Sequence, residues 1–256
     1  MLSVIVITKN EETNIKKCLE TVKWADEIIV LDSGSTDNTV EIAKEYTNKV
    51  FVTDFPGFGR QKNRALEKAT GTWVLSLDAD EVLSPELQKE IKEVVRKNLD
   101  QDAYKIPRLS SYCGKVIKYG DWRKEKSIRL FRRDKGKFSE DLVHEHIAID
   151  GLVNELKSPM YHKAFTSFEQ VLNKMNMYST LGAKQKFKEG KKGGLIRALI
   201  HGGWTFMRCF GLRFGFLDGY HGFMLAVSNA EGTYYKYLKL GMLYPPKAGP
   251  IKVKHR

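Results

Sequence analysis

Acidic side chains follow short apolar runs at two places in the first third of the chain. Asp78 and Asp80 come directly after residues 74–77, and Asp32 comes directly after residues 28–31. In an extended chain alternate residues point to the same side, so both carboxylates of the Asp-Ala-Asp sequence can face one site. Carboxylate oxygens suit Mg²⁺ or Mn²⁺, and these ions in turn bind phosphate oxygens. This placement predicts metal-assisted phosphate chemistry, although Asp-x-Asp alone is a common pattern.

These residues lie close together only if the apolar runs before them are neighbouring strands of one sheet. Thr8, Asn10 and Glu11 also follow such a run. Strands that alternate with helical spacing are typical of a mostly parallel, Rossmann-like α/β sheet with helices on both faces. Ligands of such sheets bind at the carboxyl ends of the strands. The expected strands are 3–7, 27–31, 50–52 and 73–77, and the expected helices are 10–22, 36–46, 61–69 and one that begins after Ser84.

The basic residues are unevenly distributed along the chain of 256 residues, which has a formal net charge of +12. Residues 1–150 hold 26 basic and 26 acidic residues, whereas residues 151–256 hold 17 and 5. A neutral part followed by a basic part indicates two tasks, chemistry and attraction to an anionic partner. We therefore expect a catalytic domain over 1–160 and a helical, basic region over 161–256 that associates with a membrane or a partner.

Residues 184–213 are a strongly basic stretch of that second region, with eight Lys or Arg and one Glu. Leu, Ile, Trp204 and Phe206 are interleaved, and the longest uncharged run has ten residues, whereas a membrane-spanning helix needs about 20. Basic amphipathic segments with Trp and Phe bind anionic membrane surfaces, and the abundance of Leu and Ile argues against nucleic acid. The alternative is packing on the catalytic domain or on a second subunit, so an oligomer is possible.

The three cysteines are far apart and form no Cys-x-x-Cys pair. This argues against disulfides or a zinc site and for a reducing compartment. The first residues lack a basic lead-in and a long apolar run, so no signal peptide is expected. The predicted location is the cytoplasm, peripheral on the inner face of the cytoplasmic membrane. Gly-rich phosphate-binding loops are missing from the sequence, which disfavours ATPase and nicotinamide chemistry.

Four motifs occur in the order and at the spacing of a known family, over residues 3–12, 32–37, 61–66 and 77–80. Together they resemble family 2 glycosyltransferases, which are inverting, nucleotide-sugar-dependent enzymes of the GT-A fold, over about residues 1–150. Later segments at 129–133, 142–145 and 212–219 are similar to the bacterial lipopolysaccharide core glucosyltransferases. This resemblance implies UDP-glucose as donor and a lipid-linked saccharide, such as the lipopolysaccharide inner core, as acceptor.

The resemblance also implies nucleoside-binding roles for five residues. Thr8, Asn10 and Glu11 would line the nucleoside pocket. Asp32 would accept hydrogen bonds from N–H groups of the base, which the basic Lys62 would also contact.

Further residues would bind the ribose, the metal and the diphosphate. The resemblance implies that Asp78 binds ribose and that Asp80, with Asp78 beside it, holds the Mg²⁺ or Mn²⁺ ion that bridges the diphosphate. Because Arg binds phosphate through two parallel hydrogen bonds, Arg129 or Arg132 is expected to stabilise the departing diphosphate. A basic strand face exposed to solvent is the alternative for either arginine.

An inverting transfer needs a base that takes the proton of the acceptor hydroxyl. The segment 140–146 holds the candidates, with Glu145 as first choice and Asp141 as second, and His144 or His146 could complete the metal shell. Two rival functions stay open. A nucleotidyltransferase would show a Gly-rich loop after the first strand, and a non-enzymatic module that binds membranes or nucleic acid would not explain the ordered carboxylates.

Exchange of the base is expected to slow turnover far more than it weakens donor binding. Glu145→Gln keeps the shape of the side chain but removes its basicity, and a positioned base contributes about 10²–10⁴-fold to the rate. Measuring kcat and the donor Kd of Glu145→Gln and of Asp141→Asn distinguishes the two candidates. If neither variant loses turnover, the base does not lie in this segment.

Overall fold

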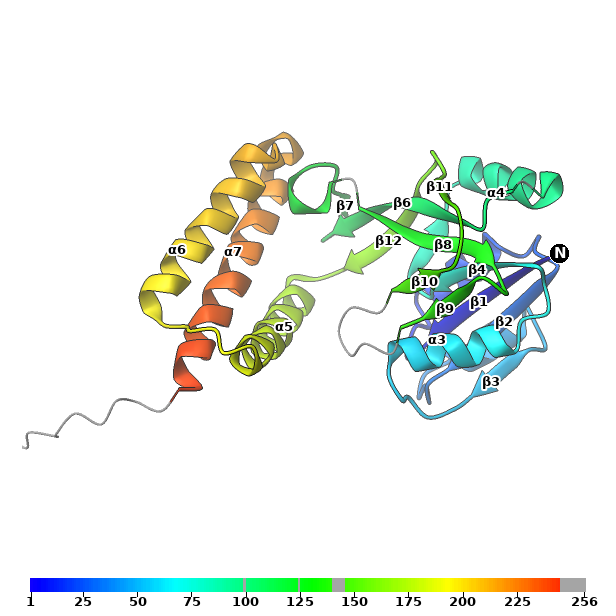
Figure 1. Ribbon diagram of the computed structural model, residues 1–256, viewed down its shortest axis with the longest axis horizontal. Coiled ribbons are helices and arrows are strands. Elements are labelled where there is room, and N and C mark those ends of the chain that lie inside the picture. The colour runs from blue at the N-terminus through cyan, green and yellow to red at the C-terminus, as the bar shows by residue number, and fades with distance from the viewer. Residues whose placement is uncertain (99, 124, 140–145, 245–256) are drawn as a thin grey trace, which may run out of the picture. The chain divides into compact units, whose positions relative to one another are not determined.

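The computed structural model describes residues 1–98, 100–123, 125–139 and 146–244 (Figure 1). The chain forms two compact units, each described by itself below. Unit 1 comprises 1–111 and 124–164, and unit 2 comprises 112–123 and 165–256. The segment 112–123 thus belongs to the second unit, although it lies within the range that the sequence assigns to the catalytic domain.

Unit 1 is built around one mixed sheet. Its strands are β1 (Leu2–Thr8), β2 (Glu27–Asp32), β3 (Val50–Val52), β4 (Trp73–Asp78), β5 (Glu81–Leu83), β6 (Ala103–Tyr112), β8 (Lys126–Arg132), β11 (Val153–Glu155) and β12 (Met160–Phe165). Their order is β3-β2-β1-β4-β8-β6-β12-β5, with β11 beside β6. Strands β3, β2, β1 and β4 are parallel, and β8 is antiparallel to β4 and β6. The hairpin of β9 (Gly136–Phe138) and β10 (Ile147–Ile149) pairs separately.

Helices cover both faces of this sheet, as the sequence predicts. They are α1 (Ile15–Glu20), α2 (Thr39–Lys44), α3 (Phe58–Glu67) and α4 (Pro85–Lys97). Alternate residues of β1 point to opposite faces. Val4 and Val6 pack in a core with residues of α1, α2 and α4, whereas Ile5 and Ile7 pack in a second core with Ala65 of α3. The mostly parallel α/β fold is therefore confirmed.

The first helix begins later than the sequence predicts. Asn10 has a φ of +54°, which lies outside the range of a right-handed helix, so the helix expected from residue 10 begins only at Ile15. Helix α4 begins as expected, since the Ser84 side chain caps it by accepting a hydrogen bond of 3.1 Å from the backbone N–H of Leu87.

Glu27 joins the amino-terminal ends of the central strands. Its buried carboxylate accepts hydrogen bonds from Ser3 of β1 and from Lys49, which precedes β3. It also accepts 2.9 Å and 3.1 Å hydrogen bonds from the backbone N–H and hydroxyl of Thr70. Burial by itself raises the pKa of Glu27, but these hydrogen bonds outweigh it and lower the pKa from 4.5 to about 2. Glu27 thus links segments at the amino-terminal edge of the parallel strands, opposite to the edge at which Thr8, Asp32 and Asp78 lie.

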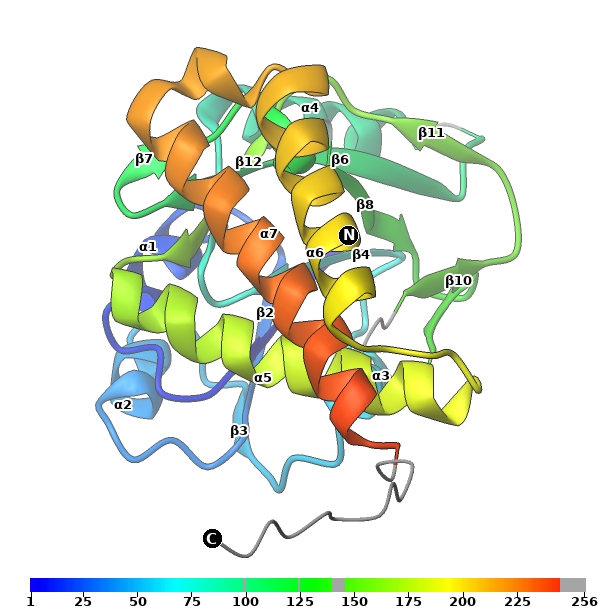
Figure 2. The ribbon, with the colours of Figure 1, turned by 90° about the vertical axis from the view of Figure 1, so that its left-hand side faces the viewer.

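Unit 2 contains three longer helices, α5 (Phe168–Lys188), α6 (Leu195–Phe206) and α7 (Gly219–Met242). Helix α7 packs against both α5 and α6, and α6 and α7 run side by side (Figure 2). The shorter elements are β7 (Lys115–Val116), the turns Gly120–Trp122 and Gly215–Asp218, and a π-helical segment, Met207–Leu212. A side chain at Gly222 would place its Cβ only 1.9 Å from the carbonyl oxygen of Gly215, so glycine is required where α7 begins.

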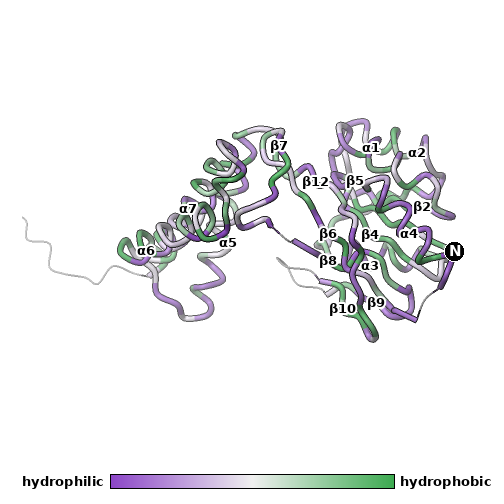
Figure 3. The backbone as a smooth tube through the Cα atoms, turned by 90° about the horizontal axis from the view of Figure 1, so that it is seen from above, coloured by the Kyte–Doolittle hydropathy of each residue, from purple (hydrophilic) through white to green (hydrophobic). Residues whose placement is uncertain are grey.

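Two aspartates hold the segment 112–123 against the helices of unit 2. Asp218 accepts hydrogen bonds from the backbone N–H groups of Lys118 and Tyr119. Asp121 pairs with Arg208 at 2.8 Å and with Arg213 at 2.7 Å. Hydrophobic residues, in green, recur along α6 and α7 in Figure 3, but none of the described helices is long and apolar enough to cross a membrane.

Loss of the Glu27 carboxylate is expected to destabilise unit 1 at neutral pH. The lowered pKa of Glu27 corresponds to on the order of 3 kcal/mol of stability above about pH 5, which the wild type loses as the pH falls towards about 2. Urea unfolding of Glu27→Gln should therefore show a large deficit at pH 7 that shrinks in acid. Glu41→Gln, at an exposed residue, is the control, and an equal deficit in both variants would contradict the account.

Candidate active site

The carboxyl ends of β1, β2 and β4 meet at one edge of the sheet. Thr8 is paired with Asp32, and Ile7 is paired with Asp78. The backbone N–H of Ser33 donates a 2.9 Å hydrogen bond to the carbonyl of Thr8, so the β1–β2 ladder continues beyond the last residue of β2. The polar residues that end three separate apolar runs of the sequence are therefore neighbours in space.

The loops after β1 and β2 are tied to each other by hydrogen bonds. The side-chain oxygen of Asn10 accepts from the backbone N–H of Thr36 at 2.8 Å, and the N–H of Asn10 donates to Ser35 Oγ at 2.8 Å. The N–H of Glu11 donates to Thr39 Oγ1 at 2.8 Å. Two of the predicted nucleoside-binding residues, Asn10 and Glu11, thus belong to a loop that is held in shape by hydrogen bonds to residues that follow β2.

Asp32 and Thr8 differ in how their polar atoms are satisfied. Asp32 is fully buried, and its carboxylate accepts 2.8 Å hydrogen bonds from the backbone N–H groups of Gly34 and Ser35 and a 2.5 Å hydrogen bond from Ser35 Oγ. It shapes this turn, and its contact with a base stays a prediction. The hydroxyl of Thr8 is buried and has no hydrogen-bond partner in the described part of the chain, so a ligand could satisfy it.

Asp78 is held between two cations from different elements. Its Oδ1 lies 3.0 Å from Lys62 Nζ on α3, and its Oδ2 lies 3.0 Å from Arg129 Nη2 on β8. Both cations are buried, and Asp78 is half-buried. Burial disfavours the charged carboxylate, but the two cations outweigh it and hold the pKa of Asp78 far below its usual range. The end of β4 therefore carries a carboxylate that stays ionised and is held in place by its two cations.

Glu81 supports this arrangement from a fully buried position. It accepts hydrogen bonds from the backbone N–H of Asp78 at 3.0 Å and from Arg129 Nη2 at 2.5 Å, and it pairs with Arg108 at 3.4 Å. Burial raises the pKa of Glu81, and the charge of Asp78 adds to this effect although Arg129 opposes it. Neither Glu81 nor Arg108 was predicted as a site residue, and the only signal for Glu81 in the sequence is its position directly after Asp80.

The network lines a pocket of 500 Å³ within unit 1, which lies in the size range of small-molecule sites. Lys and Arg outnumber the acidic residues in its wall, so an anionic ligand is favoured there. The described residues that line it are Lys62, Asp78, Lys105, Arg108, Glu125, Lys126, Ser127, Ile128, Arg129, Phe138, His146 and Ile147.

Asp80 contacts an imidazole that the sequence did not single out. Its Oδ2 lies 3.3 Å from Nε2 of His162, whose Nδ1 lies 3.0 Å from Ser110 Oγ. The pairing of β12 with β5 brings His162 opposite Glu81 and hence next to the end of β4. A lone histidine so far along the chain from Asp80 has no spacing pattern that could have revealed it.

The Asp80–His162 pair has the chemistry of a partial metal site. Imidazole and carboxylate both bind Mn²⁺, and Mg²⁺ is commonly held by one or two carboxylates together with substrate phosphates. No group of three or more acidic, His or Cys side chains suited to a metal occurs among the residues that the structure describes. The pair therefore fits an ion whose remaining ligands are diphosphate oxygens and water.

Cys18 lies beneath the carboxylates of this edge. Burial raises the pKa of the Cys18 thiol, and the charges of Glu81, Asp80, Asp78 and Glu11 raise it further. A thiol in such a position stays protonated and is not a nucleophile. The Sγ atom of Cys18 lies 3.7 Å from the backbone carbonyl oxygen of Asp78.

Arg132 is not brought to this site. It pairs with Trp73, the first residue of β4, and its guanidinium stacks 4.8 Å from the indole of that residue. It also donates a 3.2 Å hydrogen bond to the Asn98 side chain. Because Asp78 is the last residue of β4, Arg132 lies at the opposite end of the strand, and only Arg129 of the two arginines is at the site.

The predicted bases Glu145 and Asp141, together with His144, lie outside the described residues. The residues on either side of that segment are described. Ser139 and His146 pair through a 2.9 Å backbone hydrogen bond, and His146 lines the pocket of the Asp78 network.

Comparison with known proteins gives a family for the chain. Residues 3–158 match the family glycosyl transferase family 2. An uncharacterized glycosyltransferase of Rickettsia typhi is 35% identical over 252 residues, which cover 93% of this chain and 86% of that protein. The lipopolysaccharide core biosynthesis glycosyltransferase LpsC of Rhizobium meliloti is 28% identical over 257 residues, which cover 97% of this chain and 95% of that protein.

Among solved structures, S. aureus TarS 1–349 is 21% identical with a TM-score of 0.46, and the match covers 70% of this chain and 64% of that one. The sequence relatives span nearly the whole chain, and the family match covers the unit that carries the site. The chain therefore belongs to glycosyl transferase family 2, and it is a glycosyltransferase that uses a nucleotide-sugar donor.

Proposed function

We propose that the chain is a metal-dependent, inverting enzyme that moves glucose from UDP-glucose onto a lipid-linked saccharide, such as the lipopolysaccharide inner core. The observation that carries this proposal is the ionised carboxylate of Asp78 beside the Asp80–His162 pair, at the carboxyl end of β4. The acceptor is supported by LpsC, a lipopolysaccharide core enzyme that aligns over 97% of the chain. Glucose is supported by the segments that resemble glucosyltransferases.

The nucleoside would bind over the linked loops after β1 and β2. Thr8 offers a buried hydroxyl that needs a partner, Asn10 and Glu11 lie in the loop that follows it, and Asp32 is paired with it at the end of β2. Asp78 would accept hydrogen bonds from the ribose hydroxyls, because its neighbouring cations keep it ionised. Lys62 and Arg129 hold Asp78 in place, and their predicted contacts with the base and with the departing diphosphate stay predictions.

Asp80 and His162 would hold the Mg²⁺ or Mn²⁺ ion. When bound, such an ion neutralises the charge that develops on the leaving diphosphate. Ser110 contacts Nδ1 of His162 and so fixes the ring with Nε2 directed at Asp80. The basic wall of the neighbouring pocket adds positive potential that attracts the anionic donor.

Glu145, or Asp141 in its place, would accept the proton of the acceptor hydroxyl. His146 follows this segment directly and lines the pocket beside Asp78. The proposed base is therefore at most a few residues in sequence from the wall of the proposed donor site.

Removing either proposed metal ligand should abolish metal-dependent donor binding. The Kd for UDP-glucose in the presence of Mn²⁺ should rise at least about tenfold in Asp80→Asn and in His162→Gln. Excess chelator should weaken donor binding to the wild type by a similar factor and should have little effect on the variants. Isothermal titration calorimetry with and without Mn²⁺ measures these values.

His146→Gln is the matched control, because His146 lies near the site but outside the pair. If this variant loses Mn²⁺-dependent binding and His162→Gln keeps it, the metal shell contains the other histidine. Full turnover of the wild type in excess chelator would contradict metal dependence altogether.

We also propose that α6 and the preceding loop bind an anionic membrane surface. The apolar side chains on one side of α6 are strongly exposed, from 55% for Trp204 to 75% for Ile196. The opposite side, with Ala198, Gly202 and Thr205, is buried. Exposed cations occur at the end of α5, in the loop before α6 and on α6 itself, namely Lys184, Lys188, Lys191, Lys192 and Arg197.

Some residues counted for this surface from the sequence have other partners. Arg208 and Arg213 are paired with Asp121. Phe206 is half-buried and stacks on Phe210 with ring centroids 5.5 Å apart. The proposed membrane surface therefore consists of the exposed cations named above and the exposed apolar side of α6, which includes Trp204.

Charge reversal of Lys188, Lys191 and Lys192 to Glu should release most of the protein from anionic vesicles. Each basic residue near such a surface contributes about 1 kcal/mol, and high salt should have a similar effect on the wild type. Reversal of Lys16, Lys17 and Lys89, which are exposed on unit 1, is the control with the same charge change. Equal sedimentation of the wild type with neutral and anionic vesicles would contradict the electrostatic part.

A further inference from the structure

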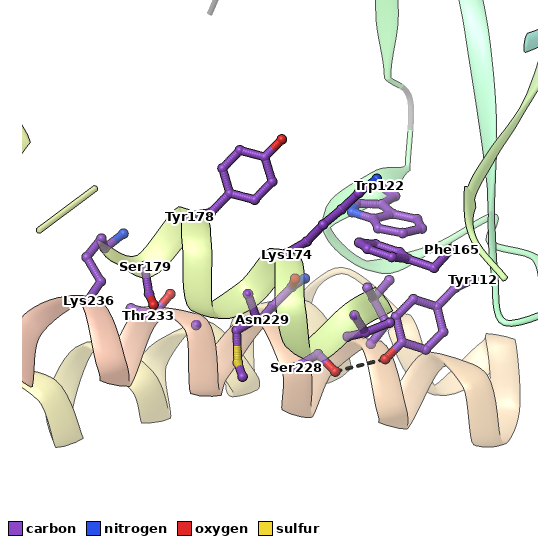
Figure 4. Close-up of a pocket in the computed structure, with 14 residues that line it drawn as sticks. Tyr112, Trp122, Phe165, Lys174, Tyr178, Ser179, Ser228, Asn229, Thr233 and Lys236 are labelled. Carbon is purple, nitrogen blue, oxygen red and sulfur yellow. Dashed lines mark hydrogen bonds between the residues drawn. The ribbon is translucent and has the colours of Figure 1, made fainter. Parts of the chain in front are cut away.

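Unit 2 contains a second pocket, of 310 Å³, that the donor site does not use (Figure 4). Its wall is formed by α5, α7, the segment 112–123 and Phe165, all within this unit. The volume is at the lower end of the range of small-molecule sites and suits a ligand of one or two rings.

Aromatic rings form one end of this pocket. Trp122 and Phe165 are stacked at 6.0 Å with an angle of 17°, and Tyr112 meets both rings edge-on (Figure 4). Trp122 and Phe165 are only half-buried, so part of their surface is open to the pocket. The C–H groups of a sugar ring carry partial positive charge and pack well on the electron-rich face of such rings.

Polar side chains of α7 form another part of the wall. Ser228, Asn229 and Thr233 lie on the side of the helix that faces α5 and the aromatic rings (Figure 4). The hydroxyl of Ser228 is 2.8 Å from that of Tyr112. Hydroxyl and amide groups can each donate and accept, which matches the hydroxyl groups of a saccharide.

The charged residues in the wall are all cations. Lys174 lies 5.0 Å from the ring centre of Phe165, and Lys236 lies at the end of the pocket away from Trp122 (Figure 4). None of the 14 described residues that line the pocket is acidic. Gly182 leaves room for the side chain of Lys236, because a Cβ atom at position 182 would lie only 2.9 Å from Cδ of Lys236.

Lys236 has the surroundings of an anion-binding group. It is half-buried, its ammonium group lies 5.7 Å from the ring centre of Tyr237, and it has no salt bridge to an acidic residue in the part of the chain that the structure describes. Burial lowers the pKa of Lys236, and the charges of Lys186 and Arg208 lower it further. A ligand anion would compensate a lysine that lies among other cations.

We propose that this pocket binds a saccharide that carries a phosphate or carboxylate group. The sugar ring would pack on Trp122 and Phe165, and the anion would pair with Lys236. Identifying this saccharide as part of the acceptor rests on the proposed function, whereas its binding in the pocket does not. Anionic sugars would thus be selected over neutral ones by unit 2 rather than by the donor site.

The test is a titration of the full chain with glucose 6-phosphate, glucuronate, glucose and inorganic phosphate. Met175 lines the pocket, so ¹³C-methyl-methionine NMR reports on occupancy directly. We expect saturable shifts of Met175 with one of the two anionic sugars, at a Kd at least about tenfold below those of glucose and inorganic phosphate. Comparing glucose 6-phosphate with glucuronate distinguishes the phosphate from the carboxylate.

Two variants and a control assign the contacts. Lys236→Gln should raise the Kd of the preferred sugar at least about tenfold, and Trp122→Leu should raise it while leaving the weak binding of inorganic phosphate unchanged. Lys118→Gln, at an exposed residue of the segment 112–123 that does not line the pocket, should bind like the wild type. Unchanged binding in Lys236→Gln, or inorganic phosphate bound as tightly as the sugars, would overturn the proposal.

UDP-glucose binding measured on the same samples separates this proposal from the donor function. Donor binding without any saccharide binding would overturn the pocket proposal alone. Saccharide binding in the pocket without donor binding would support the pocket and overturn its assignment to the acceptor.

Discussion

The pairing of Asp78 with Lys62 and Arg129 is the interaction on which the site depends. A carboxylate taken partly out of water protonates unless cations hold it ionised, and here one cation comes from a helix and the other from a neighbouring strand. This requires α3 on one face of the sheet and β8 beside β4. Glu81 also pairs with Arg129, so the ionised state of Asp78 depends on several elements at once.

The strand ends were predictable because they follow from local patterns. Short β-branched runs that alternate with helical spacing define a parallel sheet, and a parallel sheet gathers its carboxyl ends at one edge. Thr8, Asp32 and Asp78 are adjacent for this reason alone. The start of α1 was not predictable in this way, because the left-handed conformation of Asn10 accompanies contacts with the next loop.

The partners of these residues depend on strand pairing between distant segments, which no local pattern contains. His162 reaches Asp80 because β12 pairs with β5, and Arg129 rather than Arg132 reaches Asp78 because of the register between β8 and β4. Composition was misleading in a similar way for the second unit. Arg208 contributes to the basic excess in the sequence, but in the structure it is paired with Asp121.

The central claim is that a nucleotide-sugar donor and a divalent ion bind at the carboxyl ends of β1, β2 and β4. The most direct measurement is a crystal structure with UDP-glucose and Mn²⁺, with anomalous diffraction used to locate the metal. The account predicts a manganese peak between the carboxylate of Asp80 and Nε2 of His162, with the ribose hydrogen-bonded to Asp78. A donor bound elsewhere, or manganese that contacts neither Asp80 nor His162, would contradict it.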